Sequence, residues 1–98
     1  MFTGALALDV LLGDVRSLKE KRSVVRPIVA ELRRTYAVSA AEAGHLDLHR
    51  RTLIGVAVVA VDAQRCRTVL DACERLVASH PEVEVLSART RLHTEEDD

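Results

Sequence analysis

The sequence is poor in aromatic side chains: Phe2 and Tyr36 stand alone, and tryptophan is absent. Proteins that read single-stranded nucleic acid on a sheet stack the bases on aromatic rings. The shortage excludes such a stacking platform, so any contact with nucleic acid is expected to involve phosphate groups and shape.

Long apolar runs are also missing, and no stretch reaches the roughly 18 uncharged residues of a membrane span. The apolar residues 1–12 lack a basic start, so they do not resemble a secretory signal. With 48% hydrophobic and 30% charged residues, the chain is too apolar to be disordered. These features predict a soluble, cytoplasmic protein without membrane association.

Cysteine is scarce, and the two residues present do not suit a disulfide. Cys66 and Cys73 lie seven apart in a helical pattern, which separates them by about 10 Å along the axis. That distance exceeds the reach of a disulfide. We expect both to be small buried hydrophobic residues, and we predict no cofactor.

A chain of 98 residues makes one small domain, expected over residues 1–94, followed by an acidic tail at 95–98. Its net charge of −1 hides an asymmetry. Residues 1–51 carry nine basic and six acidic groups, whereas residues 52–98 carry five and nine. Positive charge is therefore concentrated in the first half.

The apolar periodicity predicts six elements in the order strand, helix, strand, strand, helix, strand. Their expected ranges are 3–12, 18–34, 36–43, 52–61, 63–79 and a last strand from residue 83. This order is the split βαβ pattern (βαββαβ) of ferredoxin-like α+β folds. We therefore expect a four-stranded antiparallel sheet with two helices on one face.

Local signals support these elements. Ser17 and Glu20 have the spacing of a capping box at the start of the first helix, and Asp62 is a suitable N-cap for the second. Pro27 predicts one kinked helix rather than two helices. In the last strand the apolar phase shifts at Leu86, which predicts a β-bulge there.

Basic residues gather on one flank of the first helix. At 100° per residue, four of them fall within about 60° of one another. They are Lys19, Arg22, Arg26 and Arg33, which we name the basic ridge. Glu20 and Glu31 fall on another flank, so the charges are segregated. The ridge is a candidate surface for RNA phosphates, helped by Arg50 and Arg51, although a merely solvated face has the same pattern.

Lys21 falls inside the apolar stripe of the same helix. We expect its stem to lie at the edge of the core with its ammonium group extended to water. A functional ammonium is the alternative.

The face of the sheet opposite the helices is expected to be uncovered. The first and third strands are rich in Ala, Gly and Val, so this face should be apolar, and an open apolar face often marks an interface. We predict a homodimer or partner contact there. Alternatively, such small residues simply expose little area.

His45, Asp47 and His49 would point the same way in an extended segment and could ligate zinc with a water molecule. Such sites usually draw ligands from more than one element, so we predict no metal site.

Three segments resemble one known family: "SLKEKR" at 17–22, "AEAGHLDL" at 41–48 and "LIGVAVVAVDAQ" at 53–64. They look like the YlxP-like family of bacterial domains of unknown function, and the similarity spans roughly residues 3–93. Members are small ferredoxin-like proteins whose genes often lie near those for a transcription termination factor, a translation initiation factor and a ribosome-binding factor. The resemblance implies a link to ribosome assembly or translation, without an established reaction. Family members commonly have Trp at the position of His49.

Three hypotheses follow. The first is a non-catalytic module that binds ribosomal RNA or a ribosome-associated protein through the basic ridge. The second is a structural or homodimerisation domain that uses the open sheet face. The third, an acylphosphatase-like enzyme of the same fold, is disfavoured because the chain contains no Asn to position water and "GDVRS" at 13–17 is a poor phosphate loop. We therefore expect no enzymatic activity.

Overall fold

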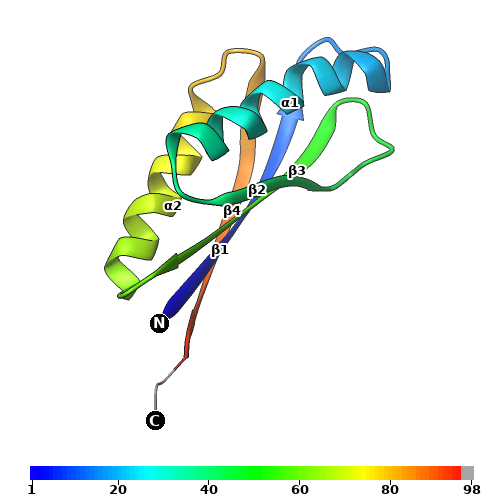
Figure 1. Cartoon of the computed structure of the whole chain (residues 1–98). Helices are drawn as coiled ribbons and strands as arrows, with labels where there is room; N and C mark the ends of the chain where they lie inside the picture. Colours follow the sequence, from blue (N-terminus) through cyan, green and yellow to red (C-terminus); the bar gives the residue numbers. More distant parts are fainter. Residues whose placement is uncertain (96–98) are drawn as a thin grey trace.

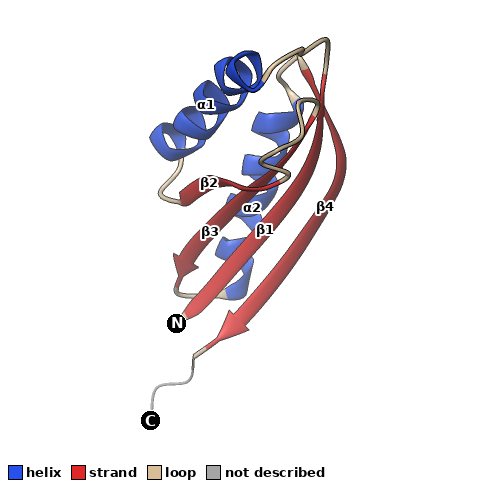
Figure 2. Cartoon of the chain, turned by 90° about the vertical axis from the view of Figure 1, so that its right-hand side faces the viewer, coloured by secondary structure: helices blue, strands red, loops and turns tan. Residues whose placement is uncertain are grey.

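The computed structural model describes residues 1–95, and these form one layer of strands and one layer of helices (Figure 1). The elements are β1 (Phe2–Leu12), α1 (Leu18–Thr35), β2 (Ser39–Gly44), β3 (Arg51–Ala60), α2 (Ala63–Ala78) and β4 (Val83–Thr94). The strand order is β2-β3-β1-β4, and every neighbouring pair is antiparallel. Both helices lie on the same side of the sheet (Figure 2). The predicted ferredoxin-like fold is confirmed.

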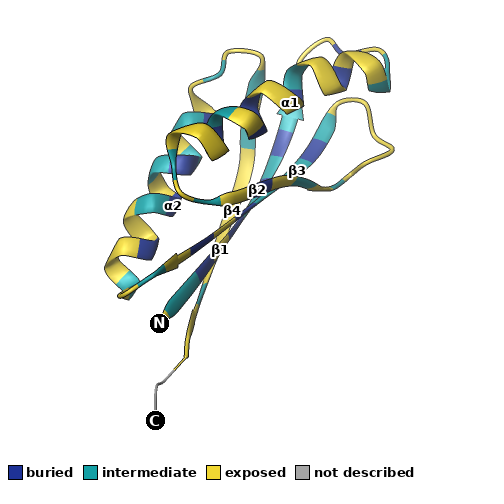
Figure 3. Ribbon diagram, viewed as in Figure 1, coloured by how far each residue is buried: buried dark blue, intermediate teal, exposed yellow. Residues whose placement is uncertain are grey.

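The core lies between the sheet and the helices, where alternate strand residues meet the apolar helix stripes (Figure 3). Its fully buried members include Leu8 on β1, Ile54 on β3, Leu32 on α1 and Leu70 on α2. Cys66 and Cys73 are free thiols with no exposed surface, as expected of small hydrophobic residues. Burial in this apolar layer raises the pKa of the Cys73 thiol.

The helix starts follow the sequence closely. Ser17 is the N-cap of α1, and its Oγ accepts a hydrogen bond from the Glu20 N–H at 3.1 Å. The second half of the predicted capping box is different, because the Glu20 carboxylate accepts from the Arg16 N–H rather than from Ser17. Asp62 caps α2 through the Arg65 N–H at 2.7 Å. Pro27 lies inside α1, which is a single helix as predicted.

β2 begins later than expected from the sequence, and β4 contains a bulge. The second strand begins at Ser39 and not at residue 36, because the Tyr36 N–H still donates to the Leu32 carbonyl of α1. In β4, Ser87 pairs with Asp9 and Val85 with Val10, so Leu86 is the extra residue of a bulge. The predicted bulge is confirmed.

The end of the described chain is tied to its start. The Glu95 N–H donates to the Met1 carbonyl at 2.9 Å, beside the last residues of β4. Of the tail predicted at 95–98, residues 96–98 lie outside the described part. Within residues 1–95, neither helix is long and apolar enough to cross a membrane.

Candidate functional site

The basic ridge lies on an exposed flank of α1. Lys19, Arg22 and Arg26 are all exposed. Within residues 1–95, none of these three side chains has a carboxylate within 4.0 Å. No carboxylate of the described chain therefore competes with a ligand for these three cations.

The acidic residues of α1 are engaged on another flank. Glu20 accepts the Arg16 N–H at 2.8 Å, and the Glu31 carboxylate lies 3.2 Å from Nε2 of His80, which follows α2. His80 also contacts Glu82 through Nδ1 at 3.3 Å. Glu20 is thus bound to the connection before α1 and Glu31 to the connection after α2, and the charge segregation expected from the sequence is present in the fold.

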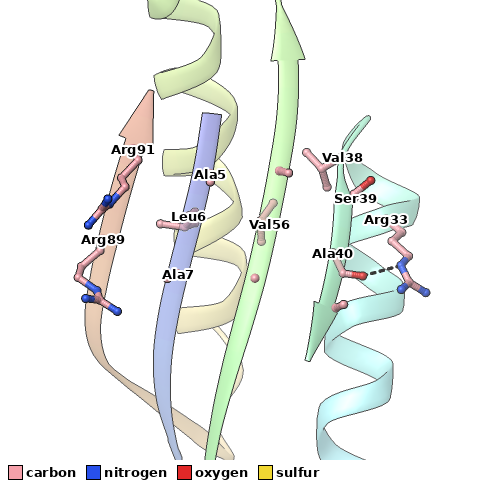
Figure 4. Close-up of a pocket in the computed structure, with 13 residues that line it drawn as sticks. Ala5, Leu6, Ala7, Arg33, Val38, Ser39, Ala40, Val56, Arg89 and Arg91 are labelled. Carbon is pink, nitrogen blue, oxygen red and sulfur yellow. Dashed lines mark hydrogen bonds between the residues drawn. The ribbon is translucent and has the colours of Figure 1, made fainter. Parts of the chain in front are cut away.

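Arg33, the last member of the ridge, has a second role. Its Nε donates to the Ala40 carbonyl at 2.9 Å, so the side chain reaches over the outer edge of β2 (Figure 4). An edge strand leaves backbone groups unpaired, and a guanidinium that binds one of them protects the edge. Arg33 also lines a hollow on the open side of the sheet.

Arg50 and Arg51, expected to help the ridge, are engaged within the molecule. The Arg50 Nε donates to the carbonyls of Leu12 at 3.2 Å and Gly13 at 2.8 Å, which ties β3 to the end of β1. The Arg51 guanidinium forms a bidentate pair with the Asp9 carboxylate, with Nη2 at 2.6 Å from both oxygens. The charge of Arg51 is thus neutralised by Asp9, and we leave Arg51 out of the candidate surface, whereas Arg50 uses only Nε and remains an exposed cation.

Lys21 is buried, so the prediction that its ammonium extends to water is wrong. Only 2% of the residue is exposed, and Nζ lies 2.9 Å from Oε2 of Glu42 and 2.7 Å from the His45 carbonyl oxygen. The buried Thr52 hydroxyl donates to the same Glu42 oxygen at 2.7 Å. Glu42 comes from β2, His45 from the β2–β3 connection and Thr52 from β3, which the periodicity of one helix cannot reveal.

Asp9, Arg51 and His45 form a second polar cluster, on the open face of the sheet. The His45 Nε2 is 3.6 Å from Oδ1 of Asp9, and a smaller hollow of about 490 Å³ lies beside them. The hydrogen bonds from Arg51 hold the pKa of Asp9 below its ordinary value, against a smaller opposing effect of burial. His45 has a left-handed φ of 57°, which the bond from Lys21 to its carbonyl helps to fix.

The zinc ligands considered from the sequence do not assemble. His45 faces Asp9, and the three residues His45, Asp47 and His49 do not make a metal-binding group. More generally, no set of three or more His, Cys, Asp or Glu side chains in residues 1–95 is arranged to hold a metal ion.

A larger hollow lies on the open sheet face and has a volume of about 1010 Å³. Its floor is made of very small residues from the three strands β1, β2 and β3: Ala5, Ala7, Ala41, Gly55 and Ala57. Arg89 and Arg91 of β4 stand on one side and Arg33 on the other (Figure 4). The sequence predicted the apolar floor but not these basic walls, because Arg89 and Arg91 come to this floor through the long-range pairing of β4 with Ala7 and Ala5 of β1.

The architecture defines a small ferredoxin-like α+β domain with a basic helix flank and an open, arginine-walled sheet face. Residues 3–90 match the family model described as "Protein of unknown function (DUF503)", so the chain belongs to this family. It is also similar to the "Uncharacterized protein YlxP" of Bacillus subtilis (strain 168), with 31% identity over 87 residues, covering 89% of this chain and 95% of the relative. The resemblance seen in the sequence is thereby confirmed.

Proposed function

We propose that the protein is a non-catalytic binding module that contacts RNA phosphates through Lys19, Arg22, Arg26 and Arg33. The observation that carries the proposal is the exposure of the first three cations on one flank of α1, while the acidic side chains of that helix are engaged elsewhere. Phosphate groups are the natural partners of such unpaired cations.

The ridge suits a folded RNA better than an unpaired strand. From residue 19 to residue 33 it extends about 21 Å at 1.5 Å per residue, enough to follow several phosphates. Sequence-tolerant binding of single strands relies on aromatic stacking, for which the chain has few residues. The expected ligand is ribosomal RNA, or a ribosome-associated protein that presents similar negative charge, and the proposal implies a cytoplasmic protein.

The test is the salt dependence of binding to ribosomal subunits and to fragments of their RNA. If about four phosphates are neutralised, the logarithm of affinity should fall against that of salt with a slope of roughly −3. Protein from its native cell should sediment with ribosomal subunits at low ionic strength and be released at high ionic strength.

Charge-reversal variants distinguish binding by the basic ridge from nonspecific attraction by any basic side chain. We expect Arg22→Glu with Arg26→Glu to abolish binding, whereas the matched pair Arg65→Glu with Arg67→Glu on α2, where both residues are exposed, should leave it nearly unchanged. Equal affinity of the ridge variant and the parent protein would refute the proposal.

A second candidate function is protein interaction through the open sheet face, with either a second copy or another protein. The supporting observation is the uncovered Ala and Gly floor, in which Ala57 is exposed. Static light scattering tests the homodimer directly: a dimer that becomes monomeric on Ala57→Glu would place the contact on this face. A monomeric parent protein would exclude the second copy.

A further inference from the structure

We propose that the open sheet face docks a single amphipathic helix of a partner protein, with small or aliphatic residues along its contact stripe and carboxylates along both edges. This inference rests on the second function proposed above and names the chemistry of the partner. It does not depend on RNA binding by the basic ridge.

The floor of the hollow is apolar and made of very small residues, so it suits an apolar partner surface that packs close to the sheet backbone. Ala5, Ala7 and Ala57 project only methyl groups, and Gly55 has no side chain. A Cβ atom added at Gly55 would lie 3.2 Å from the Ala43 Cβ, so the position favours the smallest residue. A partner can therefore reach almost to the sheet backbone across this strip and remove its apolar surface from water.

A helix matches both the width and the hydrogen bonding of this face. The backbone groups of β1 and β3 are paired within the sheet, so a ligand lying on the face must satisfy its own backbone bonds. A helix does so internally and is about 10–12 Å across. Four strands at about 4.8 Å spacing span roughly 14 Å, which leaves room for one helix between the arginine walls.

The charge of the walls defines the edges of that helix. Arg33, Arg89 and Arg91 are the charged residues lining the hollow, and no carboxylate lines it within residues 1–95. No ion pair within this range involves any of the three. Guanidinium groups pair well with carboxylates in a bidentate geometry. Asp or Glu on both flanks of the docked helix would meet all three.

The same features disfavour the two other occupants. A second copy would bring its own Arg33, Arg89 and Arg91 toward these, without carboxylates from the hollow to oppose them. The nearby Asp9 is already paired with Arg51. RNA would satisfy the arginines, but its phosphates cannot cover an apolar floor that has no aromatic ring for stacking.

The test uses synthetic helical peptides of about 18 residues with a hydrocarbon staple on the outer face. One has an Ala and Leu stripe bordered by Glu on both edges, and the other has Lys in place of every Glu. We expect the Glu peptide to bind the parent protein, and Arg89→Glu with Arg91→Glu to weaken it at least tenfold and to confer binding of the Lys peptide. The pair Arg65→Glu with Arg67→Glu is the matched control and should change little.

Backbone amide NMR shifts locate the contact. Changes at Ala5, Ala7 and Ala57 support the proposal, and changes confined to other surfaces overturn it. A dissociation constant for the Glu peptide weaker than about 1 mM, or equal affinity for the Arg89→Glu, Arg91→Glu variant, also overturns it.

Further outcomes would assign the face to another occupant and overturn the inference. One is a dimer in solution that Ala57→Glu dissociates and the Glu peptide does not. The other is a loss of RNA affinity in the Arg89→Glu, Arg91→Glu variant as large as that in the Arg22→Glu, Arg26→Glu variant. Peptide binding that survives in the ridge variant keeps this inference separate from the RNA proposal.

Discussion

At the scale of single residues, Lys21 joins α1 to the β2–β3 hairpin through an ion pair in which the lysine is buried and Glu42 is 25% exposed. Its ammonium group contacts the Glu42 carboxylate and the His45 carbonyl, while Thr52 donates to the same carboxylate. A buried charge is costly unless it is paired and fully hydrogen-bonded. The Lys21 ammonium is paired and has two acceptors for its three N–H groups, and no buried side-chain polar atom lacks a partner in residues 1–95.

Removing the Lys21 ammonium group should therefore destabilise the fold. We expect Lys21→Ala to lower the free energy of unfolding by about 2–5 kcal/mol, because the partly exposed Glu42 carboxylate would lose its counter-charge and a long buried stem would leave a cavity. Urea unfolding followed by circular dichroism measures the change. Lys19→Ala, two positions away and exposed, should stay within about 0.5 kcal/mol of the parent. Similar losses in the two variants would contradict the assigned network.

The ion pair of Asp9 and Arg51 makes the free energy of unfolding depend on pH in the acidic range. Because the folded pKa of Asp9 is lowered by the bonds from Arg51, the unfolded chain binds more protons as the pH falls below the ordinary value of about 3.9. The stabilisation is present above that pH and is lost as the pH falls through the folded pKa. We expect Asp9→Asn to be about 1–2 kcal/mol less stable at pH 7 and to lose less stability on acidification.

Urea titrations at a series of pH values between about 6 and 2 would measure this difference. Asp71→Asn on the exposed side of α2 is the control and should follow the parent curve. An acid dependence of Asp9→Asn as steep as that of the parent would show that the pair with Arg51 does not set it.

At the scale of elements, β1 and α2 approach closely where Gly4 faces the helix. A Cβ atom at Gly4 would lie 2.9 Å from Cδ1 of Leu70 and 3.3 Å from Cβ of Cys66. Leu70 and Cys66 are both buried, so neither can move freely away. This contact explains why a strand interior here accepts a residue with low strand propensity.

Gly4→Ala should consequently destabilise the fold by about 1–3 kcal/mol through overpacking of the β1–α2 contact. Gly13→Ala is the matched control, because the nearest atom to an added Cβ there, the Glu82 carbonyl oxygen, is at 3.6 Å. Thermal unfolding of the two variants gives the comparison. Stabilisation by Gly4→Ala would mean that α2 can shift away from the sheet at little cost.

The elements themselves were largely predictable from the sequence, because each depends on short-range periodicity and on local caps. The starts of α1 and α2 follow from Ser17 and Asp62, and the bulge follows from the change of apolar phase at Leu86. The start of β2 was misplaced by three residues because Tyr36 is apolar and β-prone, yet its N–H completes the last turn of α1. This local helical bond at the end of α1 delays the start of β2.

The candidate surfaces were less predictable than the elements. Helical geometry alone placed Lys19, Arg22 and Arg26 on one exposed flank. Whether the guanidinium groups of Arg50 and Arg51 are bound within the chain depends on partners that are distant in the sequence. Asp9, for example, is 42 positions from Arg51. The basic walls at Arg89 and Arg91 depend on the register of β4 beyond its bulge.

At the scale of the whole molecule, the two proposed surfaces meet at Arg33. This residue ends the basic ridge, crosses the edge of β2 and lines the open-face hollow (Figure 4). The ridge lies on α1 and the hollow on the opposite face of the sheet, so their other members are separate. The proposed RNA-binding flank and the proposed helix-docking face thus share one side chain.

Arg33→Glu should therefore weaken both binding activities by several-fold. In contrast, Arg22→Glu with Arg26→Glu should affect RNA alone, and Arg89→Glu with Arg91→Glu the Glu-edged peptide alone. Parallel titrations with an RNA fragment and the peptide measure the pattern, and circular dichroism verifies that Arg33→Glu keeps its fold despite losing the bond to Ala40. An Arg33 variant that changes one activity only would show that the surfaces are independent.

The sequence by itself determined the order of elements, the caps, the apolar stripes and the clustering of cations on α1, since all of these depend on residues a few positions apart. Only the tertiary structure decided that Lys21 is buried, that Arg50 and Arg51 are bound within the chain, and that Arg33, Arg89 and Arg91 surround one apolar floor. These outcomes depend on strand register and on partners distant in the sequence. Burial and close pairing with such partners determine whether a charged side chain stabilises the fold or is free to bind a ligand.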